Sequence, residues 1–221
     1  MGFSIAIDGP AGAGKSTMAK AVAKKLNFIY VDTGAMYRAM ALFLIRNQVS
    51  AQDMDGISSK CQDADITIKY ENNEQVIYLN GENVNGLIRT EEVGNMASAS
   101  SVNKEVRLKL VDLQRKLAKT ADVVMDGRDI GTHVLPQAEL KIYLTADAGV
   151  RAQRRCIELE ARGIASDVDR IKRDIMERDE RDMTREISPL CQAEDAILID
   201  TSEMSIENAV EAIMQLYYQI K

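Results

Sequence analysis

The sequence has few of the residues that mark several common classes of protein. Its three cysteines, Cys61, Cys156 and Cys191, are odd in number and widely spaced, so neither a disulfide framework nor a paired-thiolate zinc site is indicated. The only histidine, His133, is expected to be structural. No apolar run approaches the ~20 residues that span a bilayer, and the N-terminus lacks the pattern of a secretory signal. We therefore expect a soluble, cytoplasmic protein.

An excess of basic residues is also missing. The formal net charge of -6 argues against a general nucleic-acid binder, which needs a basic face to displace counterions from phosphates. Any phosphate-binding site must therefore be local.

A length of 221 residues suits one core with inserts better than two independent domains.

Apolar runs and helical periodicity alternate along most of the chain. This alternation predicts an α/β fold with a parallel sheet flanked by helices. The segments 65–70 and 75–79 break the pattern, because they alternate like the strands of a small antiparallel insert. Strands are expected at 3–7, 28–31, 123–125, 141–144 and 197–199, and helices at 15–26, 35–46, 91–119, 148–185 and 205–220, the last capped by Ser205.

A phosphate-binding loop follows the first predicted strand. The residues match GxxxxGK[ST] and open a helix, the context in which backbone N–H groups and the helix dipole converge on phosphate oxygens. Lys15 is expected to reach the β- and γ-phosphates, and Ser16 to supply a hydroxyl ligand to Mg²⁺. The pattern alone does not distinguish ATP from GTP, or an enzyme from a switch. The predicted nucleotide-binding residues are Gly9, Pro10, Ala11, Gly12, Ala13, Gly14, Lys15, Ser16 and Thr17.

Two polar clusters follow later predicted strands. Residues 32–38 read DTGAMYR and residues 125–129 read MDGRD. In an open parallel sheet, ligands bind beyond the carboxyl ends of the strands, so we expect both clusters near the phosphate loop. For the first cluster a structural role is the alternative, with Thr33 as the helix N-cap. A carboxylate of the second cluster is a candidate for the Mg²⁺ shell or for the acceptor, and a simple surface turn is the alternative.

Arginines dominate the basic residues of the segment 151–189, where Lys172 is the only lysine. The planar guanidinium donates paired hydrogen bonds to phosphate and keeps its charge when water is excluded. Most of these arginines are expected to form surface pairs with neighbouring acids. Arg178, Asp182 and Arg185 share one face if the helix continues through them, and that face is the predicted site.

Together these motifs resemble one family. The sequences IDGPAGAGKST from Ile7, DTGAMYR from Asp32 and DGRDIGT from Asp126 are similar to those of the bacterial cytidylate kinases, among the P-loop nucleoside monophosphate kinases. The stretches Gly81 to Val93 and Arg178 to Leu190 add to the resemblance, which covers nearly the whole chain. It implies a P-loop kinase core at about 1–60, 95–150 and 186–221, an acceptor-binding insert at about 61–94 and a short helical lid at about 151–170.

The resemblance also implies roles for individual residues. Lys15, Arg128, Asp129, Arg178 and Arg185 are the expected catalytic residues, and Arg154 or Arg155 the expected lid contact to ATP. Arginines would hold the α-phosphate of CMP, while Ser98, Arg107, Arg178 and Asp129 would read the base and sugar. The expected CMP pocket consists of Thr33, Tyr37, Arg38, Ser98, Arg107, Arg128, Asp129, Arg178, Asp182 and Arg185.

The reaction that this resemblance implies is transfer of the γ-phosphoryl group of Mg·ATP to CMP or dCMP. We expect the protein to be a monomer that binds neither nucleic acid nor a membrane. Such a transfer depends on positioning and charge neutralisation and uses no covalent intermediate. Two alternatives stay open: a kinase for another small acceptor, such as UMP, AMP or shikimate, and a nucleotide-dependent switch without an acceptor.

Overall fold

The computed structural model describes residues 2–71, 74–161 and 163–221. A five-stranded sheet has the strand order β2-β6-β1-β7-β8, and a three-stranded sheet has the order β3-β4-β5. The predicted α/β fold, with a parallel sheet and a small antiparallel one, is confirmed. The chain divides into two compact units, which we call the middle unit (Ile29–Ala121) and the terminal unit (Phe3–Phe28 with Asp122–Lys221).

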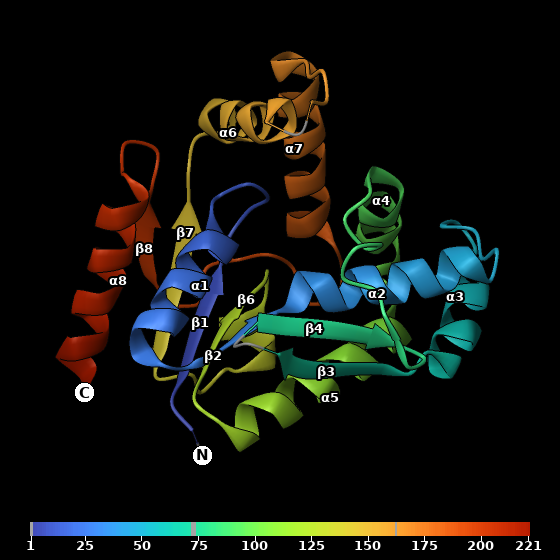
Figure 1. Ribbon diagram of the computed structural model, residues 1–221, viewed down its shortest axis with the longest axis horizontal. Coiled ribbons are helices and arrows are strands. Elements are labelled where there is room, and N and C mark those ends of the chain that lie inside the picture. The colour runs from blue at the N-terminus through green and yellow to red at the C-terminus, as the bar shows by residue number, and fades with distance from the viewer. Residues whose placement is uncertain (1, 72–73, 162) are drawn as a thin grey trace. The chain divides into compact units, whose positions relative to one another are not determined.

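The terminal unit holds four strands of the parallel sheet with helices packed against them (Figure 1). Its elements are β1 (Ser4–Asp8), α1 (Lys15–Leu26), β6 (Val123–Asp126), the short helix η2 (Ile130–Val134), β7 (Leu140–Thr145), α6 (Ala148–Glu160), α7 (Val168–Thr184), β8 (Ile197–Asp200) and α8 (Ile206–Ile220).

The central strands of this unit explain where its loops emerge. Every residue of β1 and of β6 is buried, as expected of parallel strands that are covered on both faces. β1 pairs in parallel with β6, with Ile7 opposite Asp126, and on its other side with β7. Because neighbouring parallel strands end at the same edge of a sheet, the loops that follow β1 and β6 emerge side by side.

The middle unit contains the small antiparallel sheet. β3 and β4 pair from Ile66 opposite Leu79 to Glu71 opposite Glu74, and the helix α2 packs on both strands and on α4 and α5 (Figure 1). Its elements are β2 (Ile29–Asp32), α2 (Thr33–Arg46), α3 (Met54–Lys60), η1 (Cys61–Asp63), β3 (Ile66–Glu71), β4 (Glu74–Leu79), β5 (Glu82–Asn83), α4 (Glu91–Ser100) and α5 (Lys104–Thr120).

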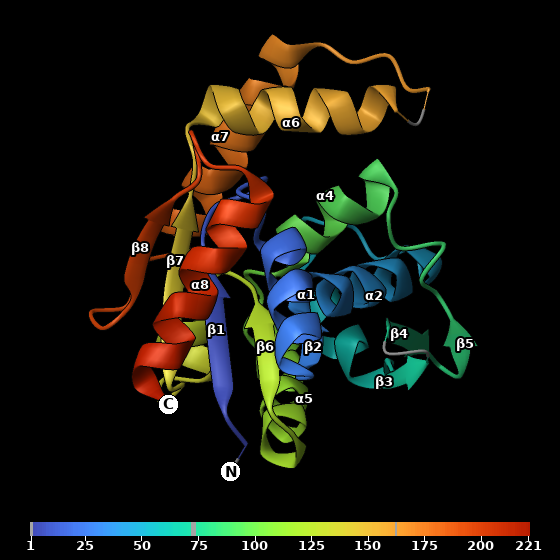
Figure 2. The same ribbon diagram turned by 60° about the vertical axis from the view of Figure 1, so that its left-hand side comes forward.

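Two predicted helices are wrong in their continuity. The segment 91–119 divides into α4 and α5, because the side chain of Asn103 caps α5 by accepting hydrogen bonds from two backbone N–H groups. The segment 148–185 divides into α6 and α7, which begins at the N-cap Asp167. Figure 2 shows α6 leaving the carboxyl end of β7 and α7 beside it. Ser205 caps α8 as predicted, by accepting a hydrogen bond from Asn208.

Within the described residues, none of the helices combines the length and the apolar composition of a membrane-spanning segment.

Candidate active site

The phosphate loop lies between β1 and α1, as the sequence predicted. Gly9 begins it with a φ of 145°, in the region that favours glycine. A Cβ at this position would lie 1.9 Å from the carbonyl oxygen of Leu144 in β7. A side chain there is therefore incompatible with the close approach of the loop to the sheet.

Lys15 lies buried at the start of α1 and donates a hydrogen bond of 2.6 Å to the carbonyl oxygen of Pro10. Burial lowers the pKa of this ammonium group well below its usual value, and the positive charges of Arg128 and Arg178 lower it further. The carboxylates of Asp126 and Asp8 oppose that shift. Three cationic side chains thus gather at the end of the phosphate loop, where an anionic ligand would relieve their repulsion.

Ser16 joins the phosphate loop to the strand β6. Its hydroxyl donates a hydrogen bond of 2.8 Å to the carboxylate of Asp126, the last residue of that strand. A hydroxyl and a carboxylate are oxygen ligands of the kind that Mg²⁺ prefers, usually together with waters and substrate phosphates. The chemistry of this pair therefore fits a magnesium ion. No group of three or more histidines, cysteines and acids that could hold a metal occurs among the residues that the structure describes.

Asp8 positions the loop that follows β6. Its carboxylate accepts hydrogen bonds of 2.8 Å and 2.7 Å from the backbone N–H groups of Ile130 and Gly131. Burial raises the pKa of Asp8 to about 6, although these two hydrogen bonds and the charge of Lys15 act against the rise. The loop that carries Arg128 and Asp129 is therefore fixed directly to the end of β1.

Buried ion pairs hold the predicted acceptor residues of the terminal unit. Arg128 donates from Nε to Asp182 of α7 at 2.8 Å. Burial alone would raise the pKa of Asp182, but the charges of Arg128 and Arg178 hold it below its usual value. Arg185 lies 3.4 Å from Asp129. The structure thus brings together the five predicted acceptor residues of this unit, Arg128, Asp129, Arg178, Asp182 and Arg185.

The predicted common helix face needs one correction. α7 ends at Thr184, and Arg185 has extended backbone angles as the C-cap, so the expectation that the helix continues through it is wrong. Arg185 instead donates from Nε to the carbonyl oxygen of Ser188.

The two candidate lid arginines have different surroundings. Arg154 donates two hydrogen bonds to Thr201, at the end of β8, through Nη1 to the hydroxyl and through Nη2 to the carbonyl oxygen. Arg155 pairs with Glu158 one turn along the same helix, and both side chains are exposed. In this arrangement Arg154 ties α6 to the sheet, whereas Arg155 faces solvent.

In the middle unit, Asp32 organises the DTGAMYR segment. Its carboxylate accepts a hydrogen bond from the N–H of Ala35 and pairs with Arg89 at 2.7 Å. Asp32 is therefore the N-cap of α2, and the alternative in which Thr33 caps this helix is wrong. The side chain of Gln75 in β4 makes two hydrogen bonds with the backbone of Asp32. Its Oε1 accepts from the N–H at 2.8 Å, and its Nε2 donates to the carbonyl oxygen at 3.2 Å.

The other predicted acceptor residues of this unit come from α2, α4 and α5, which pack on one another through α2. The guanidinium of Arg107 lies over the ring of Tyr37, with 5.9 Å to its centroid. Arg38 turns back toward Gly34, where its Nη1 lies 3.4 Å from the place of a Cβ. Ser98 is buried in α4. That these residues face the phosphate loop stays a prediction.

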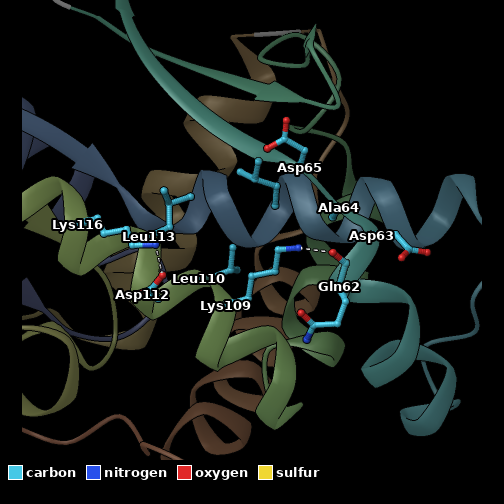
Figure 3. A pocket seen from close by; sticks show the side chains of 10 residues that line it. Gln62, Asp63, Ala64, Asp65, Lys109, Leu110, Asp112, Leu113 and Lys116 are labelled. Carbon is cyan, nitrogen blue, oxygen red and sulfur yellow. Dashed lines mark hydrogen bonds and ion pairs between the residues drawn. The ribbon is translucent and has the colours of Figure 1, made fainter.

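A separate pocket of about 390 Å³ lies in the middle unit between η1, the start of β3 and α5 (Figure 3). Lys109 crosses it and donates to the carbonyl oxygen of Gln62, while Lys116 pairs with Asp112 along α5. No predicted site residue lines this pocket. Its basic groups are engaged locally, and it lacks a glycine-rich loop.

Comparison with known proteins decides the family. The family model described as cytidylate kinase matches residues 5–219. A cytidylate kinase of Caldicellulosiruptor bescii is 49% identical over 218 residues, which cover 99% of this chain and 96% of the relative. One of Alkaliphilus oremlandii is 50% identical over 212 residues, covering 96% of each chain. This chain belongs to the cytidylate kinase family.

A solved structure supports the fold of this cytidylate kinase family member. A shikimate kinase from Bacteroides thetaiotaomicron superposes with a TM-score of 0.52 at 15% identity and covers 98% of each chain. At that identity the likeness shows the P-loop kinase fold alone.

Sequence reasoning did not assign several residues that organise this cytidylate kinase family site. Asp126 was recognised within its cluster but not as the partner of Ser16, and Asp8 was not considered. Arg151 and Asp179 were counted among the arginines and acids expected mostly to pair at the surface, whereas they form a buried ion pair. The sequence did contain a signal for the burial of Asp179. Asp179 and Asp182 follow Ile175 by four and seven residues, a spacing that places all three on one helix face.

Proposed function

We propose that this protein transfers the γ-phosphoryl group of ATP to CMP or dCMP and gives ADP with CDP or dCDP. Membership of the cytidylate kinase family supports the reaction. The observation on the site that carries the proposal is the gathering of Lys15, Arg128 and Arg178 at the end of the phosphate loop, where the charges of the two arginines lower the pKa of Lys15. A transferred phosphoryl group is the anion that such a cluster suits.

The donor is proposed to bind along residues 9–17, with Lys15 at the β- and γ-phosphates and the backbone N–H groups around the chain of phosphates. Ser16 and Asp126 would hold Mg²⁺, and neutralisation of phosphate charge is the chemistry that the ion supplies when it is bound. The fixed loop residues then position the donor, so little reorganisation is needed during transfer.

The acceptor is proposed to bind through arginines at its phosphate. Arg128 and Arg185 are positioned for this role by carboxylates. A guanidinium group donates paired hydrogen bonds to phosphate oxygens. An acceptor phosphate is already a good nucleophile, so no histidine base is required. The remaining proposed acceptor contacts are Thr33, Tyr37, Arg38, Ser98, Arg107, Asp129, Arg178 and Asp182.

The proposed organisation is a core with an acceptor-binding insert at about 61–94 and a lid at about 151–170. Closing a lid over ATP excludes water and so suppresses hydrolysis. We also propose that the protein acts as a monomer in the cytoplasm.

An acceptor panel tests the proposed function. Purified protein with Mg²⁺ and ATP is offered CMP, dCMP, UMP, AMP and shikimate in turn, and ADP formation is followed by a coupled assay. We expect the highest kcat/KM for CMP or dCMP and no turnover when Mg²⁺ is chelated. A higher value for UMP, AMP or shikimate would identify the other kinase, and ATP binding without any phosphorylated product would favour the switch.

A further inference from the structure

The backbone of Ala11, in the phosphate loop, is held from both sides by a buried ion pair. Its N–H donates a hydrogen bond of 2.9 Å to Oδ1 of Asp179, and its carbonyl oxygen accepts one of 2.7 Å from Nη1 of Arg151. The same Nη1 contacts Oδ2 of Asp179 at 2.5 Å, and the two side chains are only 7% and 8% exposed. The ion pair and the backbone of this one residue therefore form a closed ring of contacts.

The next residue of the loop meets the same two helices. Gly12 has a φ of 75°, and a Cβ there would lie 3.4 Å from the Cβ of Arg151 and 3.8 Å from Cδ1 of Ile175. Arg151 belongs to the first turns of α6, and Ile175 and Asp179 belong to α7. Thus α6 and α7 both contact the loop, at two successive residues.

Arg151 and the helix that carries Asp179 each make a further hydrogen bond, away from the phosphate loop. Nε of Arg151 donates to the carbonyl oxygen of Ala146 at 2.9 Å, just beyond β7. Asp182, one turn beyond Asp179 on the same face of α7, accepts from Arg128. A shift of α7 against the sheet would therefore change the position of Ala11 as well as that of Arg128.

We propose that Arg151 and Asp179 are a positioning pair that sets the backbone of the phosphate loop at Ala11 and couples its shape to the arrangement of α6 and α7. Neither side chain is required to touch the transferred group. The inference rests on the proposed function, because it assigns this loop to a donor nucleotide. A small displacement of the loop weakens its hold on the phosphates, since catalysis and binding depend on sub-ångström placement.

The test compares Asp179→Asn, Arg151→Met and the double variant. Asp174→Asn and Arg173→Met are matched controls, because they change the same residue types at exposed positions on α7. The affinity for MgATP is measured by calorimetry, the KM values and kcat by the coupled assay, and stability by thermal melting. We expect each single variant to weaken MgATP binding by about tenfold or more and to raise the KM for ATP more than that for CMP. The controls should stay within about twofold.

The double variant separates positioning from stability. Removing one member of a buried ion pair leaves an uncompensated charge, whereas removing both relieves it. We expect the double variant to melt closer to the wild type than either single variant and still to bind MgATP weakly. Recovery of MgATP affinity together with the melting temperature would overturn the proposal, and so would affinities within about twofold of the wild type in the single variants.

Binding of MgATP does not depend on the acceptor. If the wild type binds MgATP but phosphorylates no nucleotide, the proposed function fails while the affinities of the variants still decide this inference. If the wild type phosphorylates CMP and the variants bind MgATP normally, this inference alone fails.

Discussion

The two halves of α7 have similar compositions and different environments. From Val168 to Asp174 the helix is mostly exposed, and its ion pair between Arg170 and Asp174 spans 3.9 Å with side chains 66% and 62% exposed. From Ile175 onward, one face is buried and carries the pairs of Asp179 with Arg151 and of Asp182 with Arg128. Charge content alone therefore does not reveal which arginines form a site.

The difference between the halves has a simple physical origin. Exposed ion pairs are screened by water and contribute little, whereas a buried charge must be paired because it has lost its hydration. In the second half, each paired partner comes from a segment distant in sequence, so the helix joins α6 and the loop after β6 at fixed positions. The second half of the helix thus holds the phosphate loop through Asp179 and the candidate site through Asp182.

The largest expected effect is that of Arg178→Ala, on the buried side of α7. The charge of Arg178 lowers the pKa of Lys15 and also the pKa of Asp182, so Arg178 lies close to both residues. We expect kcat/KM for CMP to fall by about 10³-fold, because an arginine at a transferring phosphoryl group is worth that much or more. The affinity for MgATP, measured by calorimetry, should change by less than about threefold if the residue acts on the acceptor and the transition state.

Arg181→Ala is the matched control for Arg178, since Arg181 lies three residues further on α7 but is exposed. Its kcat/KM should stay within about twofold of the wild type. An equal loss in both variants would break the comparison, because it would show that net charge matters and the helix face does not.

The sequence allowed the phosphate-binding part of this arrangement to be predicted closely. The helix expected at 15–26 has those bounds, and the clusters after two strands were interpreted from the rule that parallel strands share an edge. For the terminal unit the hydrogen bond between Ser16 and Asp126 confirms that reasoning. Local pattern suffices here because glycines, strand and helix follow one another directly.

The pairing of buried charges was not predictable in the same way. Arg151 and Asp179 are 28 residues apart, and periodicity carries no information about which acid meets which arginine across a turn. The breaks at Asn103 and Asp167 were missed because apolar spacing continues past them, while the capping side chain that decides the break is a common surface residue. Pairings across the fold need the fold itself.

Asp182→Asn should cost far more stability than a change at an exposed charge of α7. The substitution keeps the shape of the side chain but replaces the carboxylate partner of Arg128 with a neutral amide. The side chain of Arg128 is only 19% exposed, so its charge would lack a partner in a largely buried place. We expect the free energy of unfolding, measured in urea, to fall by about 3 kcal/mol. A fall below about 1 kcal/mol would place this pair with the surface pairs and remove the distinction between the two halves.

The stability contributed by Asp182 should also depend on pH. Burial raises the pKa of this carboxyl, but Arg128 and Arg178 outweigh burial and hold the pKa below its usual 3.8. The folded state therefore binds protons at Asp182 less readily than the unfolded state, so the stabilisation is present above the unfolded pKa and is lost as the pH falls through the folded pKa. Unfolding of the wild type and of Asp182→Asn, followed from neutral pH to about pH 3, should show a difference that narrows at the acid end. A difference that grows toward acid would contradict the sign.

The smallest expected effect is that of Asp174→Asn in the exposed half. This carboxylate meets Arg170 only at 3.9 Å, with both side chains largely in water, so its loss should change the free energy of unfolding by no more than about 0.5 kcal/mol. Urea unfolding at low and high salt is the sensitive measurement, because any contribution from an exposed pair is screened by added ions. A loss comparable with that of Asp182→Asn would mean that the first half of α7 also packs against a partner, and the helix would then have to be treated as one functional surface.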